Sequence, residues 1–200
     1  MKKTKRPRAN RAYCSNYRDR ISALISRLDD EAVNDIIECF HRARENHSTI
    51  FFVGNGGSAA TASHFAQDLA EIGRKAGVRG FRAVSLTDNM SRITALANDY
   101  GYDTIFSAQV AELFKKGDVI VAISASGNSP NVIKAVECAK KLGGTAIGLV
   151  GFDGGKLARI CDHTVHIETD RGEYGPVEDI HMMLDHMITS NICASLMERG

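Results

Sequence analysis

The sequence predicts a three-layer α/β protein, in which a parallel sheet is covered by helices on both faces. Short apolar runs of strand length alternate along the chain with longer segments of helical periodicity. Two of these runs, residues 51–53 and 118–123, lead directly into glycine-rich or serine-rich turns and then into helices. The 200 residues suffice for one domain with a sizeable core, and no internal repeat or linker divides them.

The first segment of the chain is basic. Met1 to Arg11 is rich in Lys and Arg and contains Pro7, and no apolar segment of the kind found in signal peptides follows it. We expect a solvated, flexible tail over residues 1–15, and a single domain over residues 16–200.

Apolar residues recur at helical spacing from Asn16 to about Asn46. Asp29 and Asp30 interrupt this pattern, so we expect two helices, with Asp30 capping the second. These two helices precede the sheet and have apolar faces, so we expect them to pack against an apolar surface.

The later elements alternate in type. Strands are expected over residues 51–53, 81–86, 118–123, 145–150 and 163–167. Helices are expected over residues 58–72, 89–98, 105–114, 130–142, 156–160 and 173–197. Residues 151–155 should form a flexible turn, and the alternation in residues 163–167 is typical of an outer strand.

Composition excludes several classes of protein. The formal charge of +1 gives no indication of a nucleic acid or an acidic partner, and no apolar run reaches membrane-spanning length. The five cysteines include no CxxC pair and are odd in number. This usage is typical of a reduced, cytoplasmic protein rather than a disulfide framework.

The stretch from Gly54 to Ser58, Gly-Asn-Gly-Gly-Ser, follows the first strand. Its glycines permit a tight turn and close approach of backbone N–H groups to a ligand, and Ser58 can cap the next helix. Because a helix N-terminus favours anions, phosphate is the first ligand to consider. The spacing fits neither the dinucleotide fingerprint nor a Walker A loop. The alternative is a turn that binds nothing.

A serine loop follows the strand over residues 118–123. Ser124-Ala125-Ser126-Gly127-Asn128-Ser129 places three hydroxyls beside several backbone N–H groups, which suits a phosphate. In an open parallel sheet both loops would lie at the carboxyl edge, where ligands bind. A plain serine-rich helix cap is the alternative. Asp88 and Asn89 follow another strand and could contact substrate hydroxyls or cap a helix.

Two pairs of side chains have the chemistry of metal ligands. His64 and Asp68 are four residues apart on one expected helix, and Glu178 and His186 are eight apart on the last. Together they offer two imidazoles and two carboxylates, which suits zinc or another borderline divalent ion. Alternatively, His64 simply bonds to Asp68.

A second histidine on the last helix, His181, could be the metal ligand instead of His186. His181 lies three residues after Glu178 and also falls on a compatible face, although it could simply pair with Asp185 four residues later.

These motifs together resemble the sugar isomerase (SIS) domain, through Gly54–Ser58, His64-Phe65-Ala66 and the serine loop. Glu178-Asp179-Ile180-His181, with His186 after it, narrows the resemblance to the phosphoheptose isomerase branch. The resemblance implies a flavodoxin-like sheet and a homotetramer in which the N-terminal helices pack between subunits. It also implies conversion of sedoheptulose 7-phosphate to D-glycero-D-manno-heptose 7-phosphate for bacterial surface polysaccharide.

The resemblance also implies roles for individual residues. His64, Asp68, Glu178 and His186 fall on the family's metal ligands, with Asp68 as the base and His186 as the second acid/base. The family usually has Glu where this chain has Asp68, and Gln where it has Glu178. Asp68 is one methylene shorter, and the charge of Glu178 should tighten divalent metal binding. Besides Asp68 and Glu178, the residues expected to contact the sugar phosphate are Asn55, Gly56, Gly57, Ser58, Asp88, Asn89, Ser124, Ala125, Ser126 and Ser129.

A non-catalytic function is the alternative. Some SIS proteins bind a replication initiator or a phosphosugar as regulators, and such a relative lacks the histidine at the place of His186. This chain keeps that histidine, which favours the enzyme over the regulator.

Overall fold

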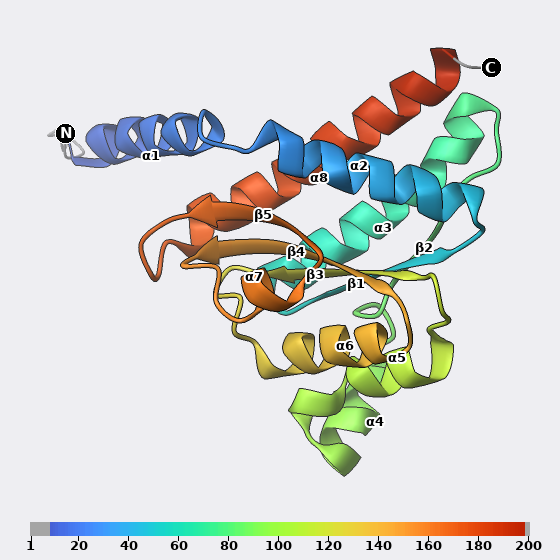
Figure 1. Ribbon diagram of the computed structural model, residues 1–200. Helices are drawn as coiled ribbons and strands as arrows, with labels where there is room; N and C mark the ends of the chain where they lie inside the picture. Colours follow the sequence, from blue (N-terminus) through green and yellow to red (C-terminus); the bar gives the residue numbers. More distant parts are fainter. Residues whose placement is uncertain (1–8, 199–200) are drawn as a thin grey trace, which may run out of the picture.

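The computed structural model describes residues 9–198 and confirms the predicted fold class. Five parallel strands form one sheet in the order β2-β1-β3-β4-β5 (Figure 1). The strands are β1 (Thr49–Gly54), β2 (Arg82–Ser85), β3 (Val119–Ser124), β4 (Thr145–Phe152) and β5 (His163–Glu168). Because each pair is parallel, all carboxyl ends meet at one edge of the sheet.

Helices cover both faces of the sheet and give it two apolar cores. The helices on one face are α2 (Asp30–Glu45), α3 (Gly57–Ala76) and α8 (Tyr174–Glu198). Those on the other face are α4 (Met90–Tyr100), α5 (Ser107–Leu113), α6 (Pro130–Lys141) and the short α7 (Leu157–Ile160), with a 3-10 turn over Tyr102–Thr104. Phe52 points into the first core and Phe51 into the second, as the alternation of side chains along a strand requires.

Burial along the strands follows their place in the sheet. Every residue of β3 is buried, since the strand is central and covered on both faces. In β5 the second half alternates between buried and exposed, and the strand lies at the edge of the sheet, as its sequence pattern predicts. β4 continues to Phe152, so Gly151, which we expected in a turn, belongs to the strand.

The N-terminal helices differ from expectation in two details. Asp29, not Asp30, caps α2, because its Oδ1 accepts the backbone N–H groups of Glu31 and Ala32 at 3.0 and 3.2 Å. The helix α1 (Ala9–Ile25) already begins at Ala9, so residues 9–15 are helical rather than part of a tail. Residues 1–8 of the expected tail lie outside the described residues.

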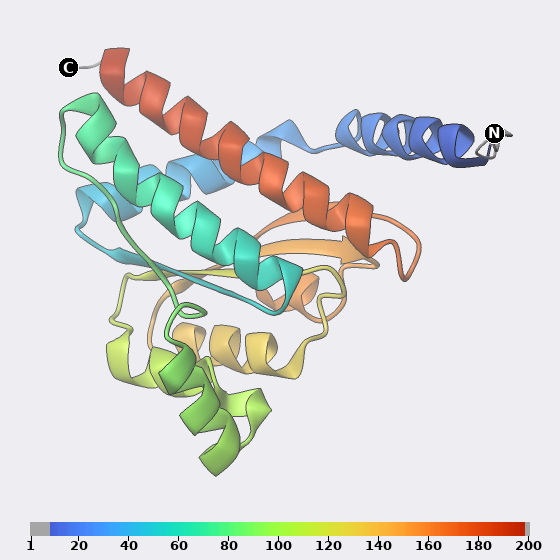
Figure 2. The same ribbon diagram turned by 180° about the vertical axis from the view of Figure 1, so that it is seen from behind.

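The helix α1 extends beyond the edge of the sheet and touches the start of α8 (Figures 1 and 2). The Tyr17 hydroxyl donates to Asp179 at 2.6 Å, and the Arg20 guanidinium pairs with Glu173 at 2.7 Å. None of the helices within residues 9–198 combines the length and apolar character needed to cross a bilayer.

Candidate active site

The glycine-rich turn carries the chain from β1 into α3. Gly56 precedes the helix with a φ of 54°, a conformation that favours glycine, and no side chain caps the helix there. Ser58 is therefore the second residue of α3 and is buried, so the prediction that it caps the helix is wrong. The positive φ of Gly56 starts the helix earlier than its sequence pattern suggests.

Two asparagines tie the glycine-rich turn to the start of α6. The side-chain amides of Asn55 and Asn131 bond reciprocally, at 2.9 and 2.8 Å. The Tyr102 hydroxyl also donates to the Asn55 oxygen at 2.9 Å. The amide of Asn55 thus holds the start of α3 against the start of α6.

The serine loop is packed tightly at its glycine. Gly127 has a φ of 61°, and a Cβ built on it would lie 2.0 Å from the Gly154 carbonyl oxygen. The Oγ atoms of Ser124 and Ser129 lie 3.2 Å apart, and Ser126 Oγ accepts the Asn128 backbone N–H at 3.2 Å. Ser129 precedes α6 without a capping side-chain bond, so the serines do not form a plain helix cap.

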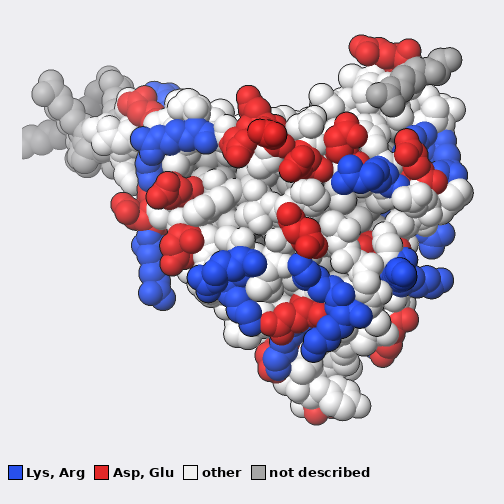
Figure 3. Space-filling view, viewed as in Figure 1, with Lys and Arg blue, Asp and Glu red and all other residues white. Residues whose placement is uncertain are grey.

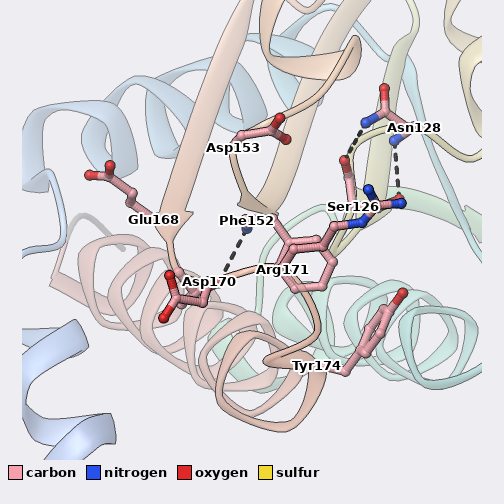
Figure 4. A pocket seen from close by; sticks show the side chains of 9 residues that line it. Ser126, Asn128, Phe152, Asp153, Glu168, Asp170, Arg171 and Tyr174 are labelled. Carbon is pink, nitrogen blue, oxygen red and sulfur yellow. Dashed lines mark hydrogen bonds between the residues drawn. The ribbon is translucent and has the colours of Figure 1, made fainter.

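A pocket of about 500 Å³ opens beside the serine loop (Figure 4). It brings together Ser126 and Asn128 from this loop, the end of β4, and the segment between β5 and α8. Its lining residues are Ser126, Asn128, Phe152, Asp153, Glu168, Thr169, Asp170, Arg171 and Tyr174. Arg171 is the one lysine or arginine among them, and its side chain extends toward Ser126 in Figure 4. Sequence analysis did not single out Arg171, because no motif marks it.

The polar residues after β2 are already engaged with the protein. Asp88 Oδ1 accepts the Ser63 hydroxyl of α3, and Thr87 Oγ1 donates to the same oxygen at 3.2 Å. Asn89 Oδ1 accepts the Arg92 backbone N–H at 3.0 Å and caps α4. For Asn89, the structure therefore shows the helix cap that we considered as the alternative.

A cluster of imidazoles and carboxylates lies where α3 and α8 run side by side in the same direction (Figure 2). Its members are His64 and Asp68 from α3, and Asp185 and His186 from α8, with one ligand atom of each within 4.8 Å of the others. The two Nε2 atoms of His64 and His186 are 3.2 Å apart. Asp68 Oδ2 lies 3.4 Å from the first and 4.0 Å from the second.

The donor set of this cluster fits a divalent metal. Ligands at about 2.0–2.2 Å from a tetrahedral zinc lie about 3.3–3.6 Å apart. His64 Nε2 is at nearly this separation from His186 Nε2 and from Asp68 Oδ2, at 3.2 and 3.4 Å, whereas Asp185 Oδ2 is 3.9 Å from it. Two imidazoles with carboxylates are also ligands that borderline divalent ions accept. The side chains of His64 and His186 are about half exposed, so an ion would have access from solvent.

Asp185 and His181 are both fully buried on α8, but they differ in their relation to the cluster. Asp185 belongs to it, and burial raises the pKa of its carboxyl to about 7, with the Asp68 carboxylate adding to the shift and His64 opposing it. His181 lies outside the cluster, and burial lowers the pKa of its imidazole to about 4. No hydrogen bond joins the two side chains, so the pairing considered from the sequence is not present.

Glu178 does not lie in the cluster, although the sequence predicts it there. Its carboxylate stands over the N-terminus of α3, where a Cβ built on Gly57 would lie 2.2 Å from Glu178 Oε2. Glu178 precedes Asp185 by seven residues of α8, which is about 10 Å of helix rise. Glu178 is therefore at the glycine-rich turn, and Asp185 takes its place in the cluster.

Comparisons with known proteins show what the chain is similar to. The model of the SIS domain family matches residues 12–151. The chain is 43% identical over 145 residues to the phosphoheptose isomerase of Aliarcobacter butzleri, covering 72% of this chain and 75% of the relative.

Two solved structures share the fold along nearly their whole length. The phosphoheptose isomerase from Neisseria gonorrhoeae superposes with a TM-score of 0.76 at 34% identity, covering 93% of this chain and 96% of that one. The phosphoheptose isomerase from Francisella tularensis superposes with a TM-score of 0.82 at 26% identity, covering 94% of this chain and 97% of that one.

Proposed function

The chain belongs to the phosphoheptose isomerase family of SIS-domain proteins, and from this premise we propose that it converts sedoheptulose 7-phosphate to D-glycero-D-manno-heptose 7-phosphate. The product would supply heptose for bacterial surface polysaccharide. One observation carries the proposal: α3 begins at the glycine-rich turn and bears His64 and Asp68 about 10 and 16 Å further along its axis. A seven-carbon sugar phosphate whose sugar lies over the glycine-rich turn would have its carbonyl end directed along α3 toward His64, the nearer of the two residues.

The serine loop would hold the phosphate. The hydroxyls of Ser124, Ser126 and Ser129 and the backbone around Ala125 are grouped within one tight loop. Arg171 lines the pocket beside Ser126 and would add a positive charge against the dianion. The backbone of Gly56 to Ser58, the carboxylates of Asp88 and Glu178 and, less directly, Asn55 and Asn89 would form the rest of the sugar site.

Proton transfer would fall to Asp68 and His186. We assign Asp68 as the base that removes a proton from the carbon next to the sugar carbonyl, which gives an enediol. His186 Nε2, 4.0 Å from Asp68 Oδ2, would serve as the second acid/base and help return a proton to the neighbouring carbon. Both side chains are partly exposed, so a substrate can reach them.

A divalent metal, which we propose to be zinc, would be held by the imidazoles of His64 and His186 and by Asp68. When bound, it would polarise the carbonyl and offset the negative charge of the enediolate. We further propose a homotetramer and a cytoplasmic location. All five cysteines are free thiols, which is consistent with a reducing compartment.

The test is turnover of sedoheptulose 7-phosphate within a panel of ketose phosphates. Asp68→Asn should lower kcat by about a hundredfold or more, because the base is lost while the shape is kept. Asp68→Glu, which restores the usual family residue, should keep substantial activity. Glu71→Gln is a matched control, since Glu71 lies on the same helix, pairs with Arg74 and is outside the cluster.

Two results would contradict the proposal in different ways. An Asp68→Asn enzyme as fast as the parent would place the base elsewhere. A parent protein that binds sugar phosphates or a replication initiator, yet is metal-free and turns over no ketose phosphate, would favour the regulatory alternative.

A further inference from the structure

The carboxylate of Asp185 is buried in an unusual way. The residue is 0% exposed, and neither carboxylate oxygen has a hydrogen-bond partner within the described part of the chain. A buried charge normally requires a partner, because the loss of its hydration costs several kcal/mol of folding free energy. An unsatisfied carboxylate in a folded core therefore calls for a ligand that the protein atoms do not supply.

The surroundings of Asp185 indicate the charge of that ligand. The nearest polar atom that pairs with it is His64 Nε2, 3.9 Å from Asp185 Oδ2. No lysine or arginine of residues 9–198 forms an ion pair with either Asp185 or Asp68. With neutral imidazoles and both carboxyls ionised, the cluster would carry two negative charges and no positive one. A divalent cation balances this charge.

The alternative ligand, Glu178, is placed differently. Its carboxylate sits against Gly57 at the first turn of α3, whereas His64 lies two turns further along that helix. To join the cluster, Glu178 would have to leave Gly57 and reach along α8 past a full turn. Asp185 needs only a small adjustment, since one of its oxygens already lies within 4.8 Å of the other three ligand atoms and 3.9 Å from His64 Nε2.

We propose that Asp185 is a ligand of the divalent metal in this chain, and that Glu178 is not. The inference rests on the proposed function, because that proposal places the metal at His64, Asp68 and His186. Asp185 completes a set of two imidazoles and two carboxylates from α3 and α8. Glu178 stays at the glycine-rich turn, where it faces the sugar instead of the metal.

The experiment titrates Zn²⁺ alone into the full-length chain after removal of bound metal with a chelator, and measures affinity by calorimetry. Asp185→Asn should weaken Zn²⁺ binding by more than tenfold, because the amide cannot balance the charge of the ion. Glu178→Gln is the matched control, because it replaces a carboxylate by an amide on the same helix. Its Zn²⁺ affinity should stay within about threefold of the parent's. A larger loss, of about ten- to a hundredfold, is typical when a residue that supports a metal ligand is replaced, so this limit tests whether Glu178 has even that role.

Thermal unfolding gives a second readout that a purely structural role for Asp185 would not produce. In the metal-free state, Asp185→Asn should unfold at the same temperature as the parent or higher, because a buried amide costs less than an unpaired buried carboxylate. Added Zn²⁺ should raise the unfolding temperature of the parent and of Glu178→Gln, but not that of Asp185→Asn. Should Asp185→Asn fail to fold, Asp185→Ser, which is smaller and neutral, serves the same comparison.

The results separate this inference from the isomerase proposal. Parent-like Zn²⁺ affinity in the folded Asp185 variant, or loss of binding in Glu178→Gln alone, would overturn the assignment. A parent that turns over the sugar phosphate without binding Zn²⁺ would also overturn it, while the isomerase proposal would stand. If zinc binding depends on Asp185 but the protein has no isomerase activity, the assignment of Asp185 is supported and the isomerase proposal is contradicted.

Discussion

The buried imidazole of His181 links protonation to stability at the scale of one residue. Burial lowers its pKa from the ordinary 6.5 to about 4. Between these two values the unfolded chain binds more protons than the folded one, so stability rises with pH across that window and is lost as the pH falls through it. At pH 7 the imidazole is neutral in both states, and its contribution is complete.

We therefore expect the parent to lose stability relative to His181→Gln when the pH is lowered from 7 to 5, since glutamine does not titrate. The loss should be at most about 2 kcal/mol over those two pH units, because a full unit of difference corresponds to about 1.4 kcal/mol. Urea unfolding at both pH values measures it. Asp185, whose pKa is raised, titrates in the opposite sense, but it is present in both proteins and its effect cancels in the difference.

His166→Gln is the control for this measurement, because His166 is exposed and its Nε2 bonds to the Phe152 carbonyl oxygen at 3.0 Å. If His166→Gln and His181→Gln change the pH dependence equally, burial of His181 is not the cause.

The hydroxyl of Ser126 should act on substrate binding rather than on chemistry. It lines the pocket beside Arg171 and lies in the loop proposed to hold the phosphate. Ser126→Ala removes one donor to a dianion, and hydrogen bonds to charged groups contribute about 1.5–3 kcal/mol, so KM should rise by roughly ten- to a hundredfold with kcat little changed. Steady-state kinetics with sedoheptulose 7-phosphate measures the split, and an unchanged KM would remove Ser126 from the phosphate site.

At the scale of elements, sequence periodicity predicts which face of a helix a residue occupies, but not its axial position against a neighbouring helix. Glu178 and His186 do share a broad side of α8, yet eight residues span about 12 Å. Which of the two meets His64 depends on how far α8 is shifted along α3, and only packing sets that shift. The same spacing argument had no means of choosing Asp185 over Glu178.

Local backbone geometry explains the smaller errors. Of two adjacent aspartates, Asp29 has the extended ψ of 101° that a capping residue needs, whereas Asp30 is already helical. The strands and their alternation with helices were predictable, because β1, β3 and β4 are short apolar runs followed by turn residues, and β5 alternates between apolar and polar residues. The pocket containing Arg171 was not, because it forms where the segment before α8 folds back onto a loop some 45 residues earlier in the chain.

For the whole molecule, basic and acidic residues nearly balance. On the face shown in Figure 3, basic and acidic side chains are interspersed, and no basic stripe runs across it. A formal charge of +1 leaves no net field that would attract a polyanion. The macromolecular partner that we expect is another protein chain.

That partner is expected to be a second copy of this chain. The helix α1 projects from the body, with Tyr13 69% exposed, and Met187 and Met197 of α8 are 40% and 54% exposed. Apolar surface of this kind on an extended helix marks an interface, and closed symmetric assemblies are the usual result. Light scattering at micromolar concentration should give about four times the chain mass of 21.7 kDa for the proposed tetramer.

A charge placed on α1 should weaken the assembly, because it would be buried against another subunit. Tyr13→Lys should therefore lower the measured mass or raise the concentration needed for assembly. Tyr100→Lys is the matched control, since Tyr100 is 72% exposed on α4, which covers the opposite face of the sheet. A monomeric parent would rule out the tetramer, and a control that dissociates as readily as Tyr13→Lys would show that α1 is not the interface.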